Sequence, residues 1–174
     1  MKIILTGAQG TGKSTILKEF QHEGYNVITE VVRNLANKGI KINEDGNSHG
    51  QKLIFDEYVN LFNSNSTFVS DRGLTDVLAY TKYLYYEDKV SATEYMREMD
   101  RLKKFLENNK DIVYIYFPIE FPLKDDGVRS MSENFREEID KNIVNILRCF
   151  HIPYITVTGD IQKRMQIIKD FIEL

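Results

Sequence analysis

The chain has 174 residues, of which 42% are hydrophobic and 28% charged, a composition typical of one globular domain and unlike that of a disordered chain. The formal net charge of −3 argues against a protein that coats nucleic acid with a basic surface. The single cysteine, Cys149, excludes an internal disulfide and a cysteine-based zinc site. No apolar run approaches the roughly 20 residues that span a membrane, so we expect a cytoplasmic protein.

Apolar segments alternate with amphipathic segments along the chain. Strands are expected where apolar and β-branched residues run together, at about 2–6, 26–30, 67–70, 111–117 and 153–157. Helices are expected where apolar residues recur at helical spacing, at about 13–22, 31–38, 48–62, 71–86, 91–108, 130–150 and 160–174. Strands that are buried on both faces and separated by helices form parallel sheets. The sequence therefore predicts a single α/β domain over residues 1–174, with a three-layer α/β/α fold and a five-stranded parallel sheet.

Three of the expected helices carry sequence signals for their first residues. Ser48 with Gln51, Ser91 with Glu94, and Ser130 with Glu133 match the pattern in which a serine and an acid or amide three residues later satisfy each other's backbone N–H groups. We therefore place the three helix starts there. Cys149, near the end of the 130–150 helix, is expected to be a small buried side chain.

The stretch GAQGTGKST at residues 7–15 is the most specific motif in the chain. It satisfies the phosphate-loop pattern and lies between an expected strand and an expected helix. In such a loop, backbone N–H groups and the helix N-terminus bind phosphates, the lysine contacts the β and γ oxygens, and the serine ligates Mg²⁺. The motif therefore predicts a site for a nucleoside triphosphate with Mg²⁺. The residues expected to hold them are Gly7, Gln9, Gly10, Thr11, Gly12, Lys13, Ser14 and Thr15, with Ser14 on the metal.

Asp71 and Arg72, at the end of the third expected strand, distinguish this chain from other phosphate-loop proteins. The base-reading Asn-Lys-x-Asp motif of GTPases has no convincing match, and the strand lacks the Asp-Glu ending of motor and helicase ATPases. An aspartate at this position can hold the Mg²⁺ water shell or an acceptor group, and the arginine provides a fork for phosphate. The pair resembles that of nucleoside and nucleotide kinases. The alternative is an ordinary surface ion pair at a helix start.

Three further charged residues are candidates for the acceptor side of the site. Glu30 ends the second expected strand, close to where the loop would hold a phosphate. Its carboxylate is a candidate base, as is that of Asp71. Arg33, one helical turn later, is a candidate for substrate binding, and Asp76 is a candidate for the same role or for orienting Arg72. For each, the alternative is a charge on a solvated helix surface.

A small lid is expected at about 118–131, where prolines and a glycine interrupt the pattern. Arg129 is the candidate to stabilise the charge of the transferring phosphoryl group, with a solvated loop residue as the alternative.

Arg164, just inside the last helix, is the candidate to lie over the adenine. Aromatic residues at helical spacing, such as Tyr58 and Tyr80, are expected in the core rather than against a nucleobase.

Several of these stretches together resemble the P-loop kinase domain of bacterial NadR-type nicotinamide riboside kinases, over nearly the whole chain. They are GAQGTGKS, Glu30–Arg33, the helix with Gln51, Asp71–Asp76, Asp125–Ser130 and Ile152–Ile155. The resemblance implies ATP and Mg²⁺ as the donor pair and a nucleoside-like acceptor. It also implies functional roles for Lys13, Ser14, Asp71 and Arg129. Arg72 departs from that group and favours an acceptor that already carries a phosphate, as in thymidylate-type kinases.

The leading hypothesis is therefore ATP-dependent phosphoryl transfer to a nucleoside, a nucleotide or a related small molecule. One alternative is a kinase that acts on a hydroxyl of a polynucleotide, which the acidic chain opposes. The other is a nucleotide-dependent switch or regulatory NTPase on the same scaffold. The sequence leaves the acceptor, the choice of base and the oligomeric state open.

Overall fold

The computed structural model describes residues 1–123, 125 and 130–172. Its strands form one five-stranded sheet with the order β2-β3-β1-β4-β5, and all neighbouring strands run parallel. The strands are β1 (Lys2–Thr6), β2 (Val27–Ile28), β3 (Phe68–Asp71), β4 (Ile112–Tyr116) and β5 (Tyr154–Thr156). The helices are α1 (Lys13–His22), α2 (Val31–Asn37), α3 (Ser48–Ser64), α4 (Leu74–Tyr86), α5 (Ala92–Asn108), α6 (Glu133–Cys149) and α7 (Ile161–Ile172), with a 3-10 turn η1 (Asn43–Asp45). The predicted fold class is confirmed.

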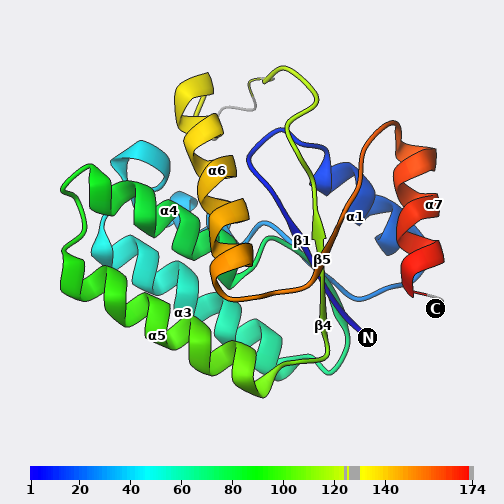
Figure 1. Ribbon diagram of the computed structural model, residues 1–174, viewed down its shortest axis with the longest axis horizontal. Coiled ribbons are helices and arrows are strands. Elements are labelled where there is room, and N and C mark those ends of the chain that lie inside the picture. Colours follow the sequence, from blue (N-terminus) through cyan, green and yellow to red (C-terminus); the bar gives the residue numbers. More distant parts are fainter. Residues whose placement is uncertain (124, 126–129, 173–174) are drawn as a thin grey trace.

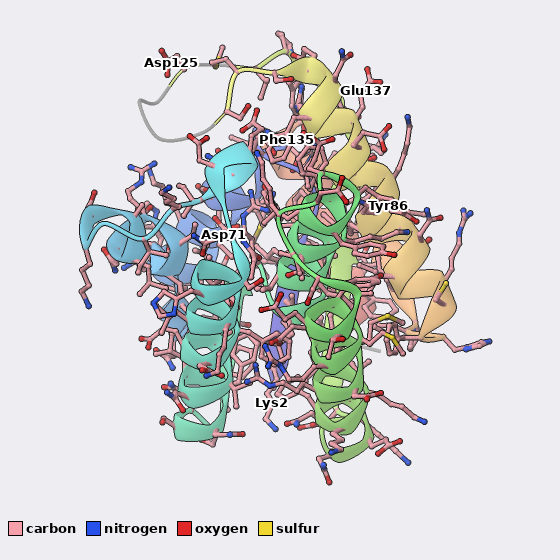
Figure 2. All side chains as sticks on the ribbon, turned by 90° about the vertical axis from the view of Figure 1, so that its left-hand side faces the viewer. Lys2, Asp71, Tyr86, Asp125, Phe135 and Glu137 are labelled. Atoms are coloured by element: carbon pink, nitrogen blue, oxygen red, sulfur yellow. The ribbon has the colours of Figure 1, made fainter. Side chains whose placement is uncertain are left out.

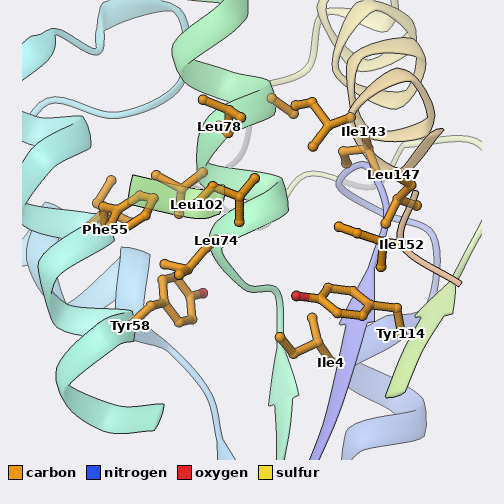
Figure 3. Close-up of a cluster of buried hydrophobic side chains, with 14 of the residues drawn as sticks. Ile4, Phe55, Tyr58, Leu74, Leu78, Leu102, Tyr114, Ile143, Leu147 and Ile152 are labelled. Atoms are coloured by element: carbon orange, nitrogen blue, oxygen red, sulfur yellow. The ribbon is translucent and has the colours of Figure 1, made fainter. Parts of the chain in front are cut away.

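Helices cover both faces of the sheet, which is why the strands are apolar on both sides (Figure 1). On the central strand β1, Ile4 faces a large cluster beneath α3, α4, α5 and α6, while Ile3 and Leu5 face a smaller cluster beneath α1 and α7. Figure 3 shows part of the large cluster, where Tyr114 of β4 lies beside Ile4. Within the described residues, no helix combines the length and apolarity needed to cross a bilayer.

The predicted first residues of two helices need correction. α3 begins at Ser48, but its N-cap is Asn47, whose side chain accepts a hydrogen bond from the Gly50 N–H at 2.9 Å. The N-cap of α6 is Ser132 rather than Ser130. Asparagine and serine cap helices about equally well, so neighbouring polar residues compete and the sequence pattern selects the wrong one. The expectation for Cys149 is also wrong, because this last residue of α6 is exposed.

The parallel strands bring distant residues together at their carboxyl ends. Leu5 pairs with Asp71 across β1 and β3, and the Arg72 N–H donates to Leu5 O at 2.9 Å. On the other side of β1, the Phe117 N–H donates to Thr6 O at 2.9 Å. These two contacts place the end of β3 and the end of β4 against the loop that follows β1.

Shortening a side chain on the central strand tests this arrangement. Ile3 is fully buried, so Ile3→Ala is expected to lower the free energy of unfolding by about 2–5 kcal/mol, through lost apolar burial and the remaining cavity. Urea unfolding followed by circular dichroism measures the change. Met131→Ala, at a side chain that is 49% exposed, is the control and should change it by less than about 0.5 kcal/mol. Equal losses in both variants would contradict the central position of β1.

Candidate active site

A cavity of about 730 Å³ lies at the carboxyl edge of the sheet, over the loop between β1 and α1. At one end it is lined by Phe121, Pro122 and the turn at residues 159–162 before α7. At the other end it is lined by Gln51 and Tyr58 of α3 and by Tyr80 of α4. This volume is within the range of sites that bury small ligands, and the loop at residues 9–16 lines the space between the two ends. One continuous cavity therefore has the phosphate loop in its middle.

The side chain of Lys13 is bound to the phosphate loop itself. Its Nζ donates to Gly7 O at 2.8 Å, to Ala8 O at 2.7 Å and to Thr11 Oγ1 at 3.2 Å. Arg72, at the end of β3, also donates to Gly7 O, at 3.4 Å. The first carbonyl oxygens of the loop are therefore bound by cationic side chains.

The next carbonyl oxygens of the loop are bound by arginines from two distant helices. Arg136 of α6 donates through Nε to Gln9 O at 2.9 Å and through Nη2 to Gly10 O at 3.2 Å. Arg164 of α7 donates through Nη1 to Thr11 O at 2.6 Å. Charge-assisted bonds of this kind are stronger than those between neutral groups. They hold the curled backbone in place. The sequence reasoning missed Arg136, whose only local signal is a charge on the inward face of an amphipathic helix.

Two glycines of the loop lie where a side chain would not fit. Gly7 has φ +147°, and a Cβ there would lie 2.4 Å from Phe117 O. Gly12 has φ +92°, and a Cβ there would lie 2.7 Å from Nη1 of Arg164. Both conformations are rare for other residues, so the motif's glycines are required by the backbone as well as by space.

Ser14 and Asp71, the two predicted metal ligands, are in direct contact. Ser14 Oγ donates to Asp71 Oδ2 at 2.8 Å, and the Tyr58 hydroxyl donates to the Asp71 carbonyl at 3.0 Å. Within the described residues, the buried Oδ1 of Asp71 has no hydrogen-bond partner. A hydroxyl beside a carboxylate with a spare oxygen is a donor set that suits Mg²⁺. The pair fits the predicted ion, although its role as a ligand stays a prediction.

Asp76 connects the phosphate loop to the start of α4. Its carboxylate is 1% exposed and accepts hydrogen bonds from the Gly7 N–H at 3.3 Å and the Gly73 N–H at 3.1 Å. Arg72 Nη1 lies 3.7 Å from the same carboxylate. Burial raises the pKa of Asp76, and the charges of Arg72 and Lys13 oppose that rise. Arg72 also takes a left-handed backbone (φ 76°), which places its side chain back toward the loop.

Polar and aromatic side chains line the end of the cavity near α3 and α4. The Arg72 guanidinium lies 5.4 Å from the centre of the Tyr80 ring, and the Tyr80 hydroxyl donates to Gln9 Oε1 at 3.2 Å. Gln51, which is 3% exposed, accepts a hydrogen bond from the Thr81 hydroxyl at 3.2 Å. Tyr80 thus lines the cavity as well as packing against the core. A polar residue on the inward face of α3 is the signal that identifies Gln51.

Glu30 and Arg33 lie at the exposed mouth of the same cavity. Arg33 Nε is 2.9 Å from Glu30 Oε2, and their side chains are 42% and 48% exposed respectively. Glu30 precedes α2 in a left-handed backbone conformation (φ 60°). The structure therefore places both candidates on the cavity lining as an ion pair, and their roles stay predictions.

Arg164 is buried at the opposite end of the cavity. Its guanidinium lies 5.4 Å from the centre of the Phe117 ring and 5.1 Å from that of Phe121, and it is paired with Glu120. Glu120 also accepts hydrogen bonds from the Gly159 N–H, at 3.1 Å and 3.2 Å. Arg164 is thus bound within the protein next to the turn before α7, and its predicted place over the adenine stays a prediction.

Arg129 lies outside the described residues, as do residues 124 and 126–128 of the expected lid at 118–131. Its role as the lid arginine stays a prediction from the sequence.

The profile of the AAA domain family matches residues 2–164. The chain belongs to this family. No curated protein sequence matches it.

Several solved structures share the fold of this family member. Deoxyadenosine kinase from M. mycoides matches with a TM-score of 0.68 and 19% identity over 99% of both chains. The NadR protein in complex with NAD and AMP-PNP matches with a TM-score of 0.74 and 13% identity, over 99% of this chain and 50% of that one. The YorR protein from Bacillus subtilis matches with a TM-score of 0.63 and 16% identity, over 100% of this chain and 96% of that one. The predicted resemblance to the P-loop kinase domain of NadR-type proteins is confirmed at the level of the fold.

Gly12 gives a direct test of the loop geometry. Gly12→Ala is expected to raise the dissociation constant for a non-hydrolysable ATP analogue at least about 100-fold, because the new Cβ displaces Arg164 and strains the backbone. Calorimetric titration measures this. Gly24→Ala is the matched control, since Gly24 also has a positive φ (+87°) but has nothing within 4 Å of its Cβ position. Equal affinities in both variants would contradict the proposed role of the loop.

Proposed function

We propose that this chain is an ATP-dependent kinase that transfers the γ-phosphoryl group to a hydroxyl of a nucleoside-like small molecule. The observation that carries the proposal is the continuous cavity, which extends from the turn before α7, past the phosphate loop, to Gln51 and Tyr80. A switch NTPase needs only the donor end of such a space. A kinase needs both ends, because donor and acceptor must meet in line at the γ-phosphate.

On the donor side, the residues of the loop bind the triphosphate. Lys13 Nζ exchanges its present contacts with Gly7 O and Ala8 O for the β and γ oxygens. Ser14 and Asp71 would hold the metal ion, and Mg²⁺ bound there would neutralise charge on the phosphates. We assign Arg129, of the predicted lid, the role of stabilising the negative charge of the transferring phosphoryl group.

On the acceptor side, the charges of the described lining occur as opposite pairs. Arg72 lies beside Asp76, and Arg33 lies beside Glu30. A phosphate-bearing acceptor needs surplus positive charge, which these pairs do not provide within the described residues. We therefore favour an uncharged nucleoside over a monophosphate, although Arg72 taken alone suggests the reverse.

The remaining lining of the acceptor side suits a nucleoside. Ile54 and Val77 provide apolar contacts, the Tyr80 ring provides a flat surface, and the Gln51 amide provides hydrogen bonds. This mixture of apolar walls and few polar groups is usual for sites that bind small molecules.

The two candidate bases can be assigned different roles. The Asp71 carboxylate binds the Ser14 hydroxyl beside the loop, so we assign Asp71 to the metal ion. Glu30 lies at the mouth of the cavity, next to the acceptor end. We therefore assign Glu30 the role of the base that accepts the proton of the acceptor hydroxyl. Arg33 then holds the Glu30 carboxylate in position.

A panel of acceptors tests the proposed reaction. Nucleosides, nucleoside monophosphates and oligonucleotides are each incubated with the protein and γ-labelled ATP, and labelled product is quantified. We expect transfer to one or more free nucleosides, and Lys13→Ala should lower the rate at least about 100-fold while the circular dichroism spectrum shows that the fold is intact. Transfer only to oligonucleotides, or ATP hydrolysis without any labelled acceptor, would contradict the proposal.

Two isosteric substitutions separate the roles of the carboxylates. Glu30→Gln is expected to lower kcat by about 100- to 10,000-fold, because it removes the base, and to leave the Mg²⁺ dependence of ATP-analogue binding unchanged. Asp71→Asn is expected to raise the Mg²⁺ concentration needed for that binding. Steady-state kinetics and calorimetry measure the two effects. The opposite pattern would exchange the two assignments.

A further inference from the structure

Arg136 is a buried cation for which the reaction outlined above has no use. It lies in the first turn of α6 and is only 1% exposed. Burying a guanidinium costs free energy unless its donors are bonded. Here Nε and Nη2 bind Gln9 O and Gly10 O, and Nη1 lies 3.3 Å from Glu133 Oε2. Among the described residues that line the cavity, Arg136 is not included, so it acts on the site only through the loop.

The two bonds from Arg136 determine which way neighbouring N–H groups point. In a planar trans peptide, the C=O and the following N–H point in opposite directions. Binding Gln9 O and Gly10 O on the outer side of the loop therefore turns the N–H groups of Gly10 and Thr11 toward its inner side. Inward-pointing N–H groups are what a phosphate-binding loop presents to its anion.

The first turns of α6, which carry Phe135, lie beside α4 (Figure 2). Phe135 packs edge-on against Tyr83 of α4, with ring centres 4.7 Å apart. One turn after Arg136, the Asp140 carboxylate accepts a hydrogen bond from the Tyr116 hydroxyl of β4 at 2.8 Å. Burial raises the pKa of Asp140, and this hydrogen bond and the charges of Lys13 and Arg136 oppose the rise. The helix that carries Arg136 is thus packed on α4 and bound to the sheet.

We infer that Arg136 is a positioning residue for the donor triphosphate. This inference rests on the proposed function. It holds the N–H groups of Gly10 and Thr11 ready for the phosphates before the nucleotide binds. Its loss should therefore weaken donor binding and leave acceptor binding little changed. A residue needed only for stability would lower the melting temperature without this selective effect.

Affinity for a non-hydrolysable ATP analogue, measured by calorimetry on the full chain, tests the inference. We expect Arg136→Met to raise the dissociation constant about 100-fold and Arg136→Lys about tenfold, since lysine keeps the charge but not the fork that reaches both carbonyls. The KM for the acceptor nucleoside should change less than twofold. All measurements are made below the melting temperature of each variant.

Arg101→Met is the matched control. Arg101 is a partly buried arginine of α5 that is paired with Asp56 and Glu98, away from the loop. This variant should lower the melting temperature and leave the dissociation constant of the analogue unchanged.

The outcomes separate the inference from the proposed function. If the wild type binds the analogue and transfers phosphoryl, but Arg136→Met binds the analogue equally well, the inference alone is overturned. Equal rises in the donor and acceptor constants overturn it too. If Arg136→Met does not fold, an unchanged dissociation constant for Arg136→Lys has the same meaning. If the wild type binds the analogue but phosphorylates no acceptor, the proposed function fails instead, and the binding comparison still decides the role of Arg136.

Discussion

The structure depends on the way cationic side chains bind the outward carbonyl oxygens of the phosphate loop, residues 7–11. Lys13 binds the first of them, Arg136 the next, and Arg164 the last. A curled loop exposes backbone groups that the regular ladders of helix and sheet cannot satisfy. Because Arg136 binds the carbonyls of Gln9 and Gly10, the N–H groups of Gly10 and Thr11 point the opposite way. The arginine bonds to Gln9 O, Gly10 O and Thr11 O therefore hold this part of the loop in its curled shape.

The end of the cavity near α3 and α4, which we propose holds the acceptor, is attached to the same loop. The Asp76 carboxylate accepts the Gly7 N–H and neutralises Arg72, and the Tyr80 hydroxyl binds the side chain of Gln9. A shift of the loop would therefore also move the side chains of Asp76 and Tyr80 on α4. This connection gives a physical reason for the donor and the acceptor to be held in a fixed alignment, which phosphoryl transfer requires.

Sequence reasoning succeeded where structure follows from local pattern and failed where it follows from tertiary contact. The phosphate loop and the parallel sheet were predicted because glycine spacing and strand hydrophobicity are local signals. Arg136 and Gln51 were missed as site residues because a single polar residue on the apolar face of a helix is a weak local signal, and what it contacts is decided by tertiary packing. The N-cap at Ser132 was missed because neighbouring serines compete. The predicted place of Arg164 over the adenine stays a prediction, and its bond to the Thr11 carbonyl follows from the fold alone.

The most direct measurement of the central claim is a crystal structure with a ligand that joins adenosine, through a chain of phosphates, to a nucleoside. We expect the adenosine near residues 159–162, the phosphates on the inward N–H groups of the loop, and the second nucleoside between Gln51 and Tyr80. A structure in which the phosphates occupy the loop but the second nucleoside lies outside the cavity would contradict the claim that one cavity holds both donor and acceptor.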